Sequence, residues 1–186
     1  ENLNIEIAGQ SLSGNVFLGN EVLADGSTIT RLGLSNISGS FGDGTTNFLE
    51  LSNGSGVLLV SPEGVAGKLS VGVTTNPSLA FSLSVDELQI AVNTTNSAVL
   101  ETIELAGESL AFDLPAGPYF RIAAIGAELV IEDQSLTADV SFQQITVNGV
   151  TETRVVITRA SLNLGPANDP FLTLSNGSGI LLINSF

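Results

Sequence analysis

Apolar and polar residues alternate with a period of two along most of the chain. Phe81, Leu83 and Val85, for example, fall on one phase, with serines between them. A period of two places successive side chains on opposite faces of a strand, so each such stretch predicts a half-buried β-strand. We therefore predict an all-β chain of long antiparallel hairpins, with right-handed twisted and bulged strands.

Turn-forming pairs separate the apolar stretches. The pairs are Asp25-Gly26, Asp43-Gly44, Asn53-Gly54, Asn148-Gly149 and Asn176-Gly177. Such pairs tolerate the positive φ angles that tight hairpins require. We predict a hairpin turn at each pair, and a two-residue tip at Asp25-Gly26 and at Asn148-Gly149.

Three stretches depart from simple alternation. The apolar phase changes at Asp86-Glu87 and again at Gln143-Gln144. One extra residue within a strand produces such a change, so we predict a β-bulge at each place. Residues 97–106, SAVLETIELA, fit a helical stripe and a strand phase equally well, and we predict a strand there.

The segment LSNGSGVLLV at residues 51–60 returns as LSNGSGILLI at residues 174–183. The match covers residues 30–60 against 153–183 at an offset of 123, and upstream residues match at an offset of 124. We predict one full module at residues 1–128 and the first half of a second copy at residues 129–186. Because this period exceeds the ~20 to 50 residues of simple solenoid repeats, each module is expected to contain several hairpins. The modules would form an extended array, either of β-sandwich-like units or of one rolled β-solenoid.

The composition limits the partners of the chain. It has 19 acidic and 5 basic residues, a net charge of −14, and no Cys, His, Trp or Met. Nucleic acids and anionic lipid surfaces are negatively charged and bind proteins through Lys and Arg. Because the chain is itself strongly negative, we expect neither as a partner. No apolar run reaches the ~18 residues of a membrane-spanning helix, so we expect no membrane insertion. The start, ENLNIEIAG, lacks the pattern of a signal peptide, so we expect a mature product or an excised segment.

The residues offer little for catalysis. Without His or Cys, the common nucleophile arrangements and zinc sites cannot form. A glycosidase could use two carboxylates, but such enzymes stack sugars on aromatic rings, and the chain has a single tyrosine, Tyr119. The NGSG motifs at 53–56 and 176–179 lack the lysine of a phosphate-binding loop. We expect no enzyme activity and no organic cofactor.

Two turn regions offer oxygen ligands for calcium. Asp43 and Asn47 lie in FGDGTTN, and Asn168 and Asp169 lie in GPANDP. Calcium prefers such carboxylate and amide oxygens. At the repeat offset, however, Asp43 corresponds to Pro166 and Asp169 to Thr46. Turn capping is therefore favoured, and calcium remains the alternative.

Lys68 is the only lysine in the chain. It could form an isopeptide bond with an asparagine beside an acid, as in some surface adhesins. We favour a simpler role, in which Lys68 is a charge on an edge strand that discourages sheet-to-sheet aggregation.

Several Gly-rich segments resemble the long β-rich repeats of very large bacterial surface proteins of the adhesin type. The segments are GQSLSGNVFL, SNISGSFGDG, LSNGSGVLLV, GVAGKL and DLPAGPYFRI. The resemblance implies a tandemly repeated module that is extracellular or displayed on a bacterial cell surface. Chains of that type often carry calcium-binding GGxGxD nonapeptides, which this sequence does not contain.

These observations favour a structural, non-catalytic module that acts as a spacer or stalk in adhesion, surface coating or matrix. One alternative is a subunit of a self-assembling extracellular filament. A second is a β-sandwich that binds a carbohydrate or another ligand. Calorimetric titration or a glycan array distinguishes the ligand-binding function from the two structural functions.

The apolar strand Ile180, Leu181, Leu182 and Ile183 predicts self-association. In the first copy VLLV continues into SPEGVAGKLSVGV, whereas in the second copy ILLI is followed by NSF. An apolar strand without a neighbour is an open edge, which folded proteins normally pair or cover. We therefore expect neighbouring copies of the chain to complete this edge, end to end, in an extended array or filament.

Overall fold

The computed structural model describes residues 2–7, 10–22, 26–43, 45–76, 81–105, 108–132, 134–147, 149–166 and 168–184. Every regular element within these ranges is a β-strand, which confirms the predicted all-β chain. Consequently, the described residues contain no helix that could cross a membrane. The strands are β1 (Asn2–Ile7), β2 (Gln10–Val22), β3 (Thr28–Gly42), β4 (Asn47–Ser61), β5 (Gly64–Thr75), β6 (Phe81–Asn93), β7 (Val99–Leu105), β8 (Glu108–Leu114), β9 (Tyr119–Ile131), β10 (Gln134–Val147), β11 (Val150–Leu164) and β12 (Leu172–Asn184).

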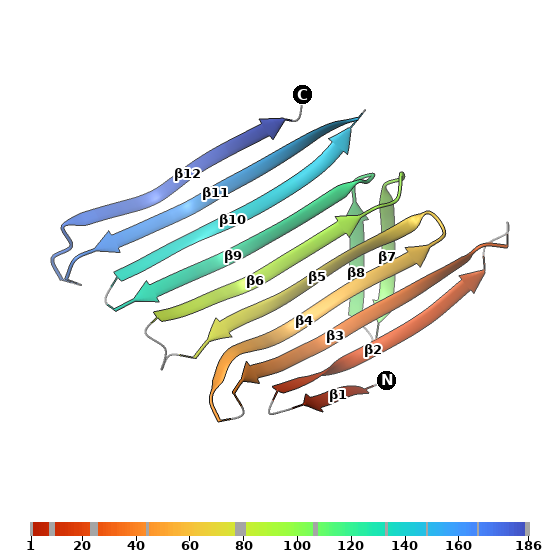
Figure 1. Ribbon diagram of the computed structural model, residues 1–186, viewed down its shortest axis with the longest axis horizontal. Coiled ribbons are helices and arrows are strands. Elements are labelled where there is room, and N and C mark those ends of the chain that lie inside the picture. Colours follow the sequence, from red (N-terminus) through yellow and green to blue (C-terminus); the bar gives the residue numbers. More distant parts are fainter. Residues whose placement is uncertain are drawn as a thin grey trace.

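Ten of these strands form one antiparallel sheet in the order β1-β2-β3-β4-β5-β6-β9-β10-β11-β12 (Figure 1). Strands β7 and β8 leave this sheet and pair with each other. The strand predicted at residues 97–106 is therefore confirmed as β7. Because β6 pairs directly with β9, the main sheet continues without a break past the excursion.

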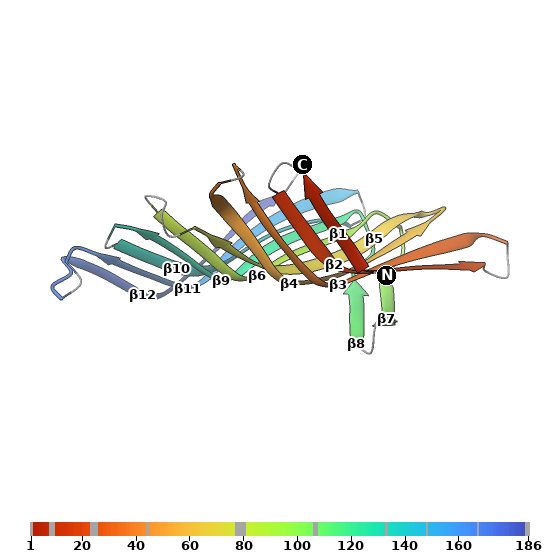
Figure 2. The ribbon, with the colours of Figure 1, turned by 90° about the horizontal axis from the view of Figure 1, so that it is seen from below.

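The β7–β8 hairpin packs on one face of the sheet and projects from it, as Figure 2 shows. It contacts β3, β4 and β6. The buried cluster beneath it contains Val57, Leu59, Ala66, Ala91, Phe112, Leu114 and Tyr119. This small core lies between the hairpin and the sheet, so one face of the sheet is covered only locally.

Alternation along β5 separates the two faces of the sheet. Ala66 is buried under the hairpin, so Lys68, Ser70 and Thr74 lie on the same face, which we call the hairpin face. Gly67, Leu69, Val71 and Val73 lie on the opposite face, which we call the open face. Cross-strand register extends both faces from β5 to the edges of the sheet.

A line of register shifts runs across the sheet. Asn36, Asn53, Arg159 and Asn176 have positive φ angles of 52°, 53°, 54° and 52°. Asn53-Gly54 and Asn176-Gly177 therefore lie inside β4 and β12, and the predicted hairpin turns at these two pairs are wrong. The left-handed conformation that asparagine tolerates serves a β-bulge as well as a turn, and the sequence pair does not distinguish them.

The predicted bulge at Asp86-Glu87 is confirmed. Val71 pairs with Leu88 and Val73 with Val85, so β6 advances by three residues where β5 advances by two. The bulge predicted at Gln143-Gln144 is wrong, since both residues pair regularly with β11. The change of offset from 124 to 123 arises instead in the β2–β3 and β10–β11 connections, which differ in length by one residue when counted between equivalent residue pairs of the flanking strands.

The hairpin tips show where that difference arises. Val147 pairs with Val150, so a two-residue tip follows β10, and Gly149 has a φ of 79°. Asn148 and Asp25 lie outside the described residues. Because Val22 pairs with Thr28, the first connection is longer, and the two-residue tip predicted at Asp25-Gly26 is wrong. At Asp43-Gly44, Asp43 lies in the β3–β4 connection, while Gly44 lies outside the described residues.

The two copies of the sequence repeat have the same register. Val16 pairs with Leu34 in the first copy, and Val140 pairs with Ile157 at the equivalent place in the second. A side-chain contact is repeated as well. The Gln10 amide donates to the Gly42 carbonyl at 2.5 Å, and the Gln134 amide donates to the Gly165 carbonyl at 3.3 Å.

Candidate functional site

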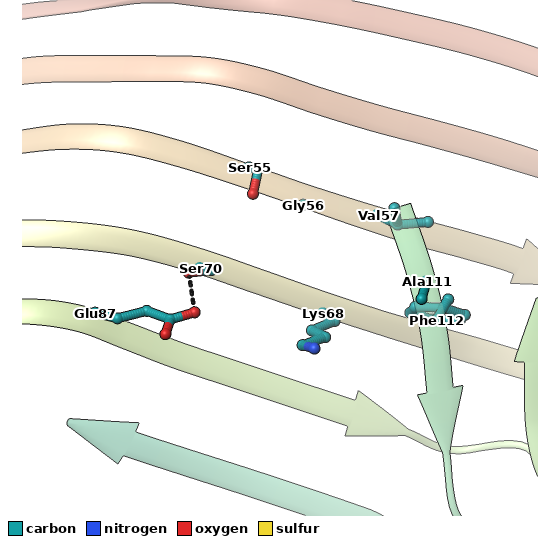
Figure 3. A pocket seen from close by; sticks show the side chains of 8 residues that line it. All are labelled: Ser55, Gly56, Val57, Lys68, Ser70, Glu87, Ala111 and Phe112. Carbon is teal, nitrogen blue, oxygen red and sulfur yellow. Dashed lines mark hydrogen bonds between the residues drawn. The ribbon is translucent and has the colours of Figure 1, made fainter. Parts of the chain in front are cut away.

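The hairpin face contains a pocket beside β8 (Figure 3). It has a volume of about 170 Å³ and is lined by Ser55, Gly56, Val57, Lys68, Ser70, Glu87, Ala111 and Phe112. Strands β4, β5 and β6 supply its floor, and β8 supplies its apolar wall. The predicted edge position of Lys68 is wrong, because β5 lies between β4 and β6 in the interior of the sheet.

A hydrogen-bond network fixes the acid of this pocket. Ser70 Oγ and Gln89 Nε2 donate to Glu87 Oε1 at 2.7 and 2.9 Å. Arg121 in turn donates to Gln89 Oε1 at 2.9 Å. The hydrogen bond from Gln89, followed by that from Ser70, lowers the pKa of Glu87, and Lys68 and Arg121 add a smaller electrostatic effect. Glu87 is therefore held as a carboxylate.

Three of the five basic residues share one cross-strand row on the hairpin face. Lys68 is opposite Ala91, Ala91 opposite Arg121, Arg121 opposite Gln143, and Gln143 opposite Arg154. Glu87 and Glu152 balance part of this charge, since Arg154 forms an ion pair with Glu152 at 2.8 Å. The pocket can therefore hold a small polar group. Its described lining contains no Asn or Asp, so it supplies no acceptor for a Lys68 isopeptide bond.

The open face is mainly apolar, and its polar side chains include the hydrogen-bonded pairs Gln144–Thr153 and Thr30–Asn20. The row through Leu69 contains Val16, Leu34, Gly56, Leu69, Ile90, Ile122, Phe142, Val155 and Leu181. The rows through Gly67, Val71 and Val73 likewise contain no charged residue among their described members. By contrast, the hairpin-face rows hold Arg31, Glu50, Lys68, Arg121, Glu128, Glu152 and Arg154.

The last strand of the sheet, β12, carries the predicted self-association residues. Ile180, Leu181, Leu182 and Ile183 are 70%, 56%, 53% and 54% exposed. Their equivalents on β4 include Val57 and Leu59, which are only 6% and 7% exposed. Strand β5 and the β7–β8 hairpin cover the β4 residues, whereas β12 pairs within the described structure only with β11.

Of the calcium candidates, Asp43 caps the turn that joins β3 to β4. Its Oδ1 accepts hydrogen bonds from the Thr45 and Thr46 amides at 2.9 and 2.8 Å. These two bonds, with that from Thr46 the larger, lower the pKa of Asp43. Asn47 is the first residue of β4 and pairs with Gly42. This geometry is that of an Asx turn, which needs no ion.

The other two calcium candidates, Asn168 and Asp169, lie in the connection between β11 and β12. The Asp169 amide donates to the Pro166 carbonyl at 2.9 Å. Four strands of the sheet separate β4 from β11, so the two pairs of candidates do not converge. The described residues contain no group of three or more potential metal-binding acids. Calcium binding stays a prediction that the structure does not test.

The hairpin face also carries an ion pair, Asp139–Arg159, that was not predicted from the sequence. Asp139 Oδ1 accepts from the Gly126 amide at 2.9 Å, and Asp139 Oδ2 lies 2.5 Å from Arg159. The hydrogen bond from Gly126, followed by the contacts with Arg159, lowers the pKa of Asp139. The first copy has Asn15 and Asn36 at these positions. The paired change from two asparagines to an acid and a base was a signal in the sequence.

Comparisons of the chain with protein-family models, curated proteins and solved structures give no match. Inferences about function therefore rest on the geometry described above and on the sequence resemblance.

Proposed function

We propose that the chain is a structural, non-catalytic repeat module of a large extracellular bacterial surface protein, in which it acts as a spacer or stalk. The observation that carries the proposal is the continuity of the sheet between the two copies. Strand β6 of the first copy pairs with β9, which leads into the second copy, along twelve residue pairs. An added module therefore widens the same sheet and needs no separate linker.

Backbone hydrogen bonds between neighbouring strands hold such an array together. Each module supplies six strands to the sheet, β1 to β6, and one hairpin that braces the hairpin face. The boundary between the modules falls inside β9, and the last residues of β9 pair with β10 as β1 pairs with β2. Burial of apolar area beneath the brace adds about 25 cal/mol per Å². The location outside a bacterial cell rests on the sequence resemblance.

The similarity of β12 to β4 favours one kind of neighbour in such an array. Strand β4 is followed in the sheet by β5, and β12 has the same register on its inner side as β4. A strand of the β5 type, accompanied by a β7–β8-type hairpin, therefore fits the outer edge of β12. Neighbouring modules are the expected partners, and assembly from separate chains would give the filament alternative.

The pocket beside β8 supports a second candidate function, the binding of a small polar ligand. Its carboxylate, ammonium and hydroxyl groups converge on a space of about 170 Å³. A glycan array or calorimetric titration tests this function. A saturable heat that Lys68→Ala abolishes would support it, and the absence of binding would leave the structural role.

An extended chain tests the proposed structural role. Residues 62–131, placed after Asn184, would supply β5, β6, β9 and the hairpin a second time. We expect three further sheet strands, which widen the particle by about 14 Å in small-angle scattering at ~4.8 Å per strand. An appended segment that stays unfolded or forms a separate compact body would contradict the proposal.

A further inference from the structure

The open face is too large and too apolar to be an ordinary protein surface. Leu18, Leu181 and Ile183 near the edges of this face are 65%, 56% and 54% exposed, and Ile122 and Phe142 nearer its centre are each 37% exposed, whereas Val71 and Val85 are only 6% and 9% exposed. Ten strands at ~4.8 Å spacing and ~3.3 Å per residue give it a geometric area of roughly 1,800 Å². Monomeric soluble proteins rarely expose apolar patches above a few hundred Å². An uncharged, mainly apolar face of this size favours a layer that covers it.

We propose that a second copy of the chain covers the open face, so that two sheets pack face to face through their apolar sides. A stable interface needs about 800 Å² from each partner, and the open face exceeds this area about twofold. Aligned sheets pack at a distance of ~10 Å with interdigitated side chains. This pairing is independent of the edge addition proposed above.

The open face is complementary to itself in shape. A groove of about 220 Å³ runs over β3 to β6 beside Gly56 and Gly67, and Leu32, Leu58 and Ile90 are among its walls. A ridge stands on β9 and β10, where Ile122 and Phe142 are each 37% exposed. The Phe120 and Phe142 rings meet edge to face at a centroid distance of 6.3 Å, which stiffens the ridge.

The positions of groove and ridge suit a two-fold axis. In the sheet, β6 lies between the centre of the groove and the ridge on β9 and β10. An axis parallel to the strands and near β6 places the ridge of each copy over the groove of the other. It also places β12 of one copy opposite β2 of the other. Such a contact is isologous and closes at two copies.

Charge and polarity favour a second copy over other occupants. The rows of the open face contain no charged residue among their described members, and the polar pair Gln144–Thr153 is hydrogen-bonded within the chain, so a charged ligand finds no counter-charge there. A net charge of −14 opposes binding to an anionic lipid surface. Two copies packed through the open face direct their hairpin faces, with the described sheet charges, outward into solvent.

Sedimentation equilibrium of the full chain at low micromolar concentration tests the pairing, with two matched pairs of variants. Leu181→Glu places a charge on the open face, and Leu182→Glu places one on the hairpin face of the same strand at similar exposure. We expect Leu181→Glu to raise the dimer dissociation constant roughly 100-fold, and Leu182→Glu to leave it nearly unchanged. Phe142→Glu and its neighbour Ser141→Glu form the second pair, with the same expectation.

Each outcome decides the proposal. A monomeric wild-type chain, or equal loss of dimer in Leu181→Glu and Leu182→Glu, overturns it. Because Leu181 is exposed in the single chain, Leu181→Glu should fold, so the test remains valid even if Phe142→Glu does not fold.

A further variant separates the face from the edge. Ile180→Pro blocks the addition of a strand at the edge of β12 but leaves the open face intact. If Ile180→Pro is the only variant that abolishes association, the contact is at the edge, and pairing through the open face is overturned. Binding of neutral phosphatidylcholine vesicles by a monomeric chain would assign the face to lipid instead.

Discussion

Strands β4 and β12 carry nearly the same ten residues in opposite surroundings. Val57 and Leu59 on β4 are 6% and 7% exposed, whereas their equivalents Ile180 and Leu182 are 70% and 53% exposed. Both strands keep the same register with their inner neighbours, and Asn53 and Asn176 have φ angles of 53° and 52°. The local sequence therefore determines the strand and its bulge, while β5 and the hairpin determine burial.

The glycines of the repeated motif show the same contrast at closer range. A Cβ atom on Gly54 would lie 2.7 Å from the Ile37 Cβ, whereas one on Gly177 would meet its nearest neighbour, the Ala160 carbonyl oxygen, at 3.4 Å. Ile37 and Ala160 are equivalent residues of β3 and β11, so the larger side chain makes the first site tight. The same glycine is thus sterically required in one copy and more tolerant in the other.

The largest expected effect is the loss of a buried side chain on β4. Leu59→Ala removes contacts with the cluster beneath the hairpin and should destabilise the chain by about 2–5 kcal/mol. The equivalent Leu182→Ala should cost less than about 1 kcal/mol, because Leu182 is half exposed. Urea unfolding of both variants at one protein concentration provides the measurement. Equal losses would mean that β5 and the hairpin do not make Leu59 more important for stability than Leu182.

Substitution of the two glycines should give a smaller difference. Gly54→Ala forces Ile37 to move, and we expect a cost of about 1–3 kcal/mol from overpacking. Gly177→Ala meets only ordinary contacts and should cost less than about 1 kcal/mol. The same unfolding experiment measures both. If Gly177→Ala proves the more damaging, the tight contact at Ile37 does not limit the first site.

The two bulge asparagines should behave alike, because each adopts the left-handed conformation without help from burial. Asn53→Ala and Asn176→Ala should each cost about 1 kcal/mol, since alanine tolerates positive φ less well. Thermal unfolding of the single and double variants measures the effect, and the two costs should add. A cost confined to Asn53 would mean that the motif is strained in only one copy.

The smallest effect expected is a difference in pH dependence between the copies at Asp139. The pKa of Asp139 is lowered in the folded chain, so its carboxylate stabilises the fold at pH values above the ordinary pKa of ~4. This contribution to the free energy of unfolding is lost as the pH falls through the lowered pKa. Asp139→Asn should therefore reduce the loss of stability between about pH 5 and pH 2. Denaturant midpoints measured over this range check the sign, and a steeper loss in the variant would contradict it.

Much of the strand pattern follows from the sequence. The period of two predicts the strands, the phase change at Asp86-Glu87 predicts a bulge, and the repeat predicts equivalent registers in β2–β4 and β10–β12. The NGSG motif does not reveal its place inside a strand, because a bulge and a hairpin turn require the same backbone conformation of asparagine. The bulge and the turn differ only in how the partner strand continues.

The sites were harder to predict, because they depend on strand order. Lys68 lies beside Glu87 because β5 pairs with β6. The apolar wall of their pocket forms because the β7–β8 hairpin folds back over the sheet and places Phe112 there. Neither follows from periodicity. The open face also becomes visible only when ten strands align their apolar phases in one layer.

Hydrogen exchange on β4 and β12 tests most directly whether β12 is a β4-type strand without its cover. The amides of residues 57–60 and 180–183 should be compared in the 186-residue chain and in the chain extended by residues 62–131. We predict slow exchange at 57–60 in both chains. Within 180–183, the amides that point away from β11 should exchange fast in the monomeric 186-residue chain and slowly in the extended one. Slow exchange of these outward amides in the 186-residue monomer, or fast exchange after the extension, would contradict the account.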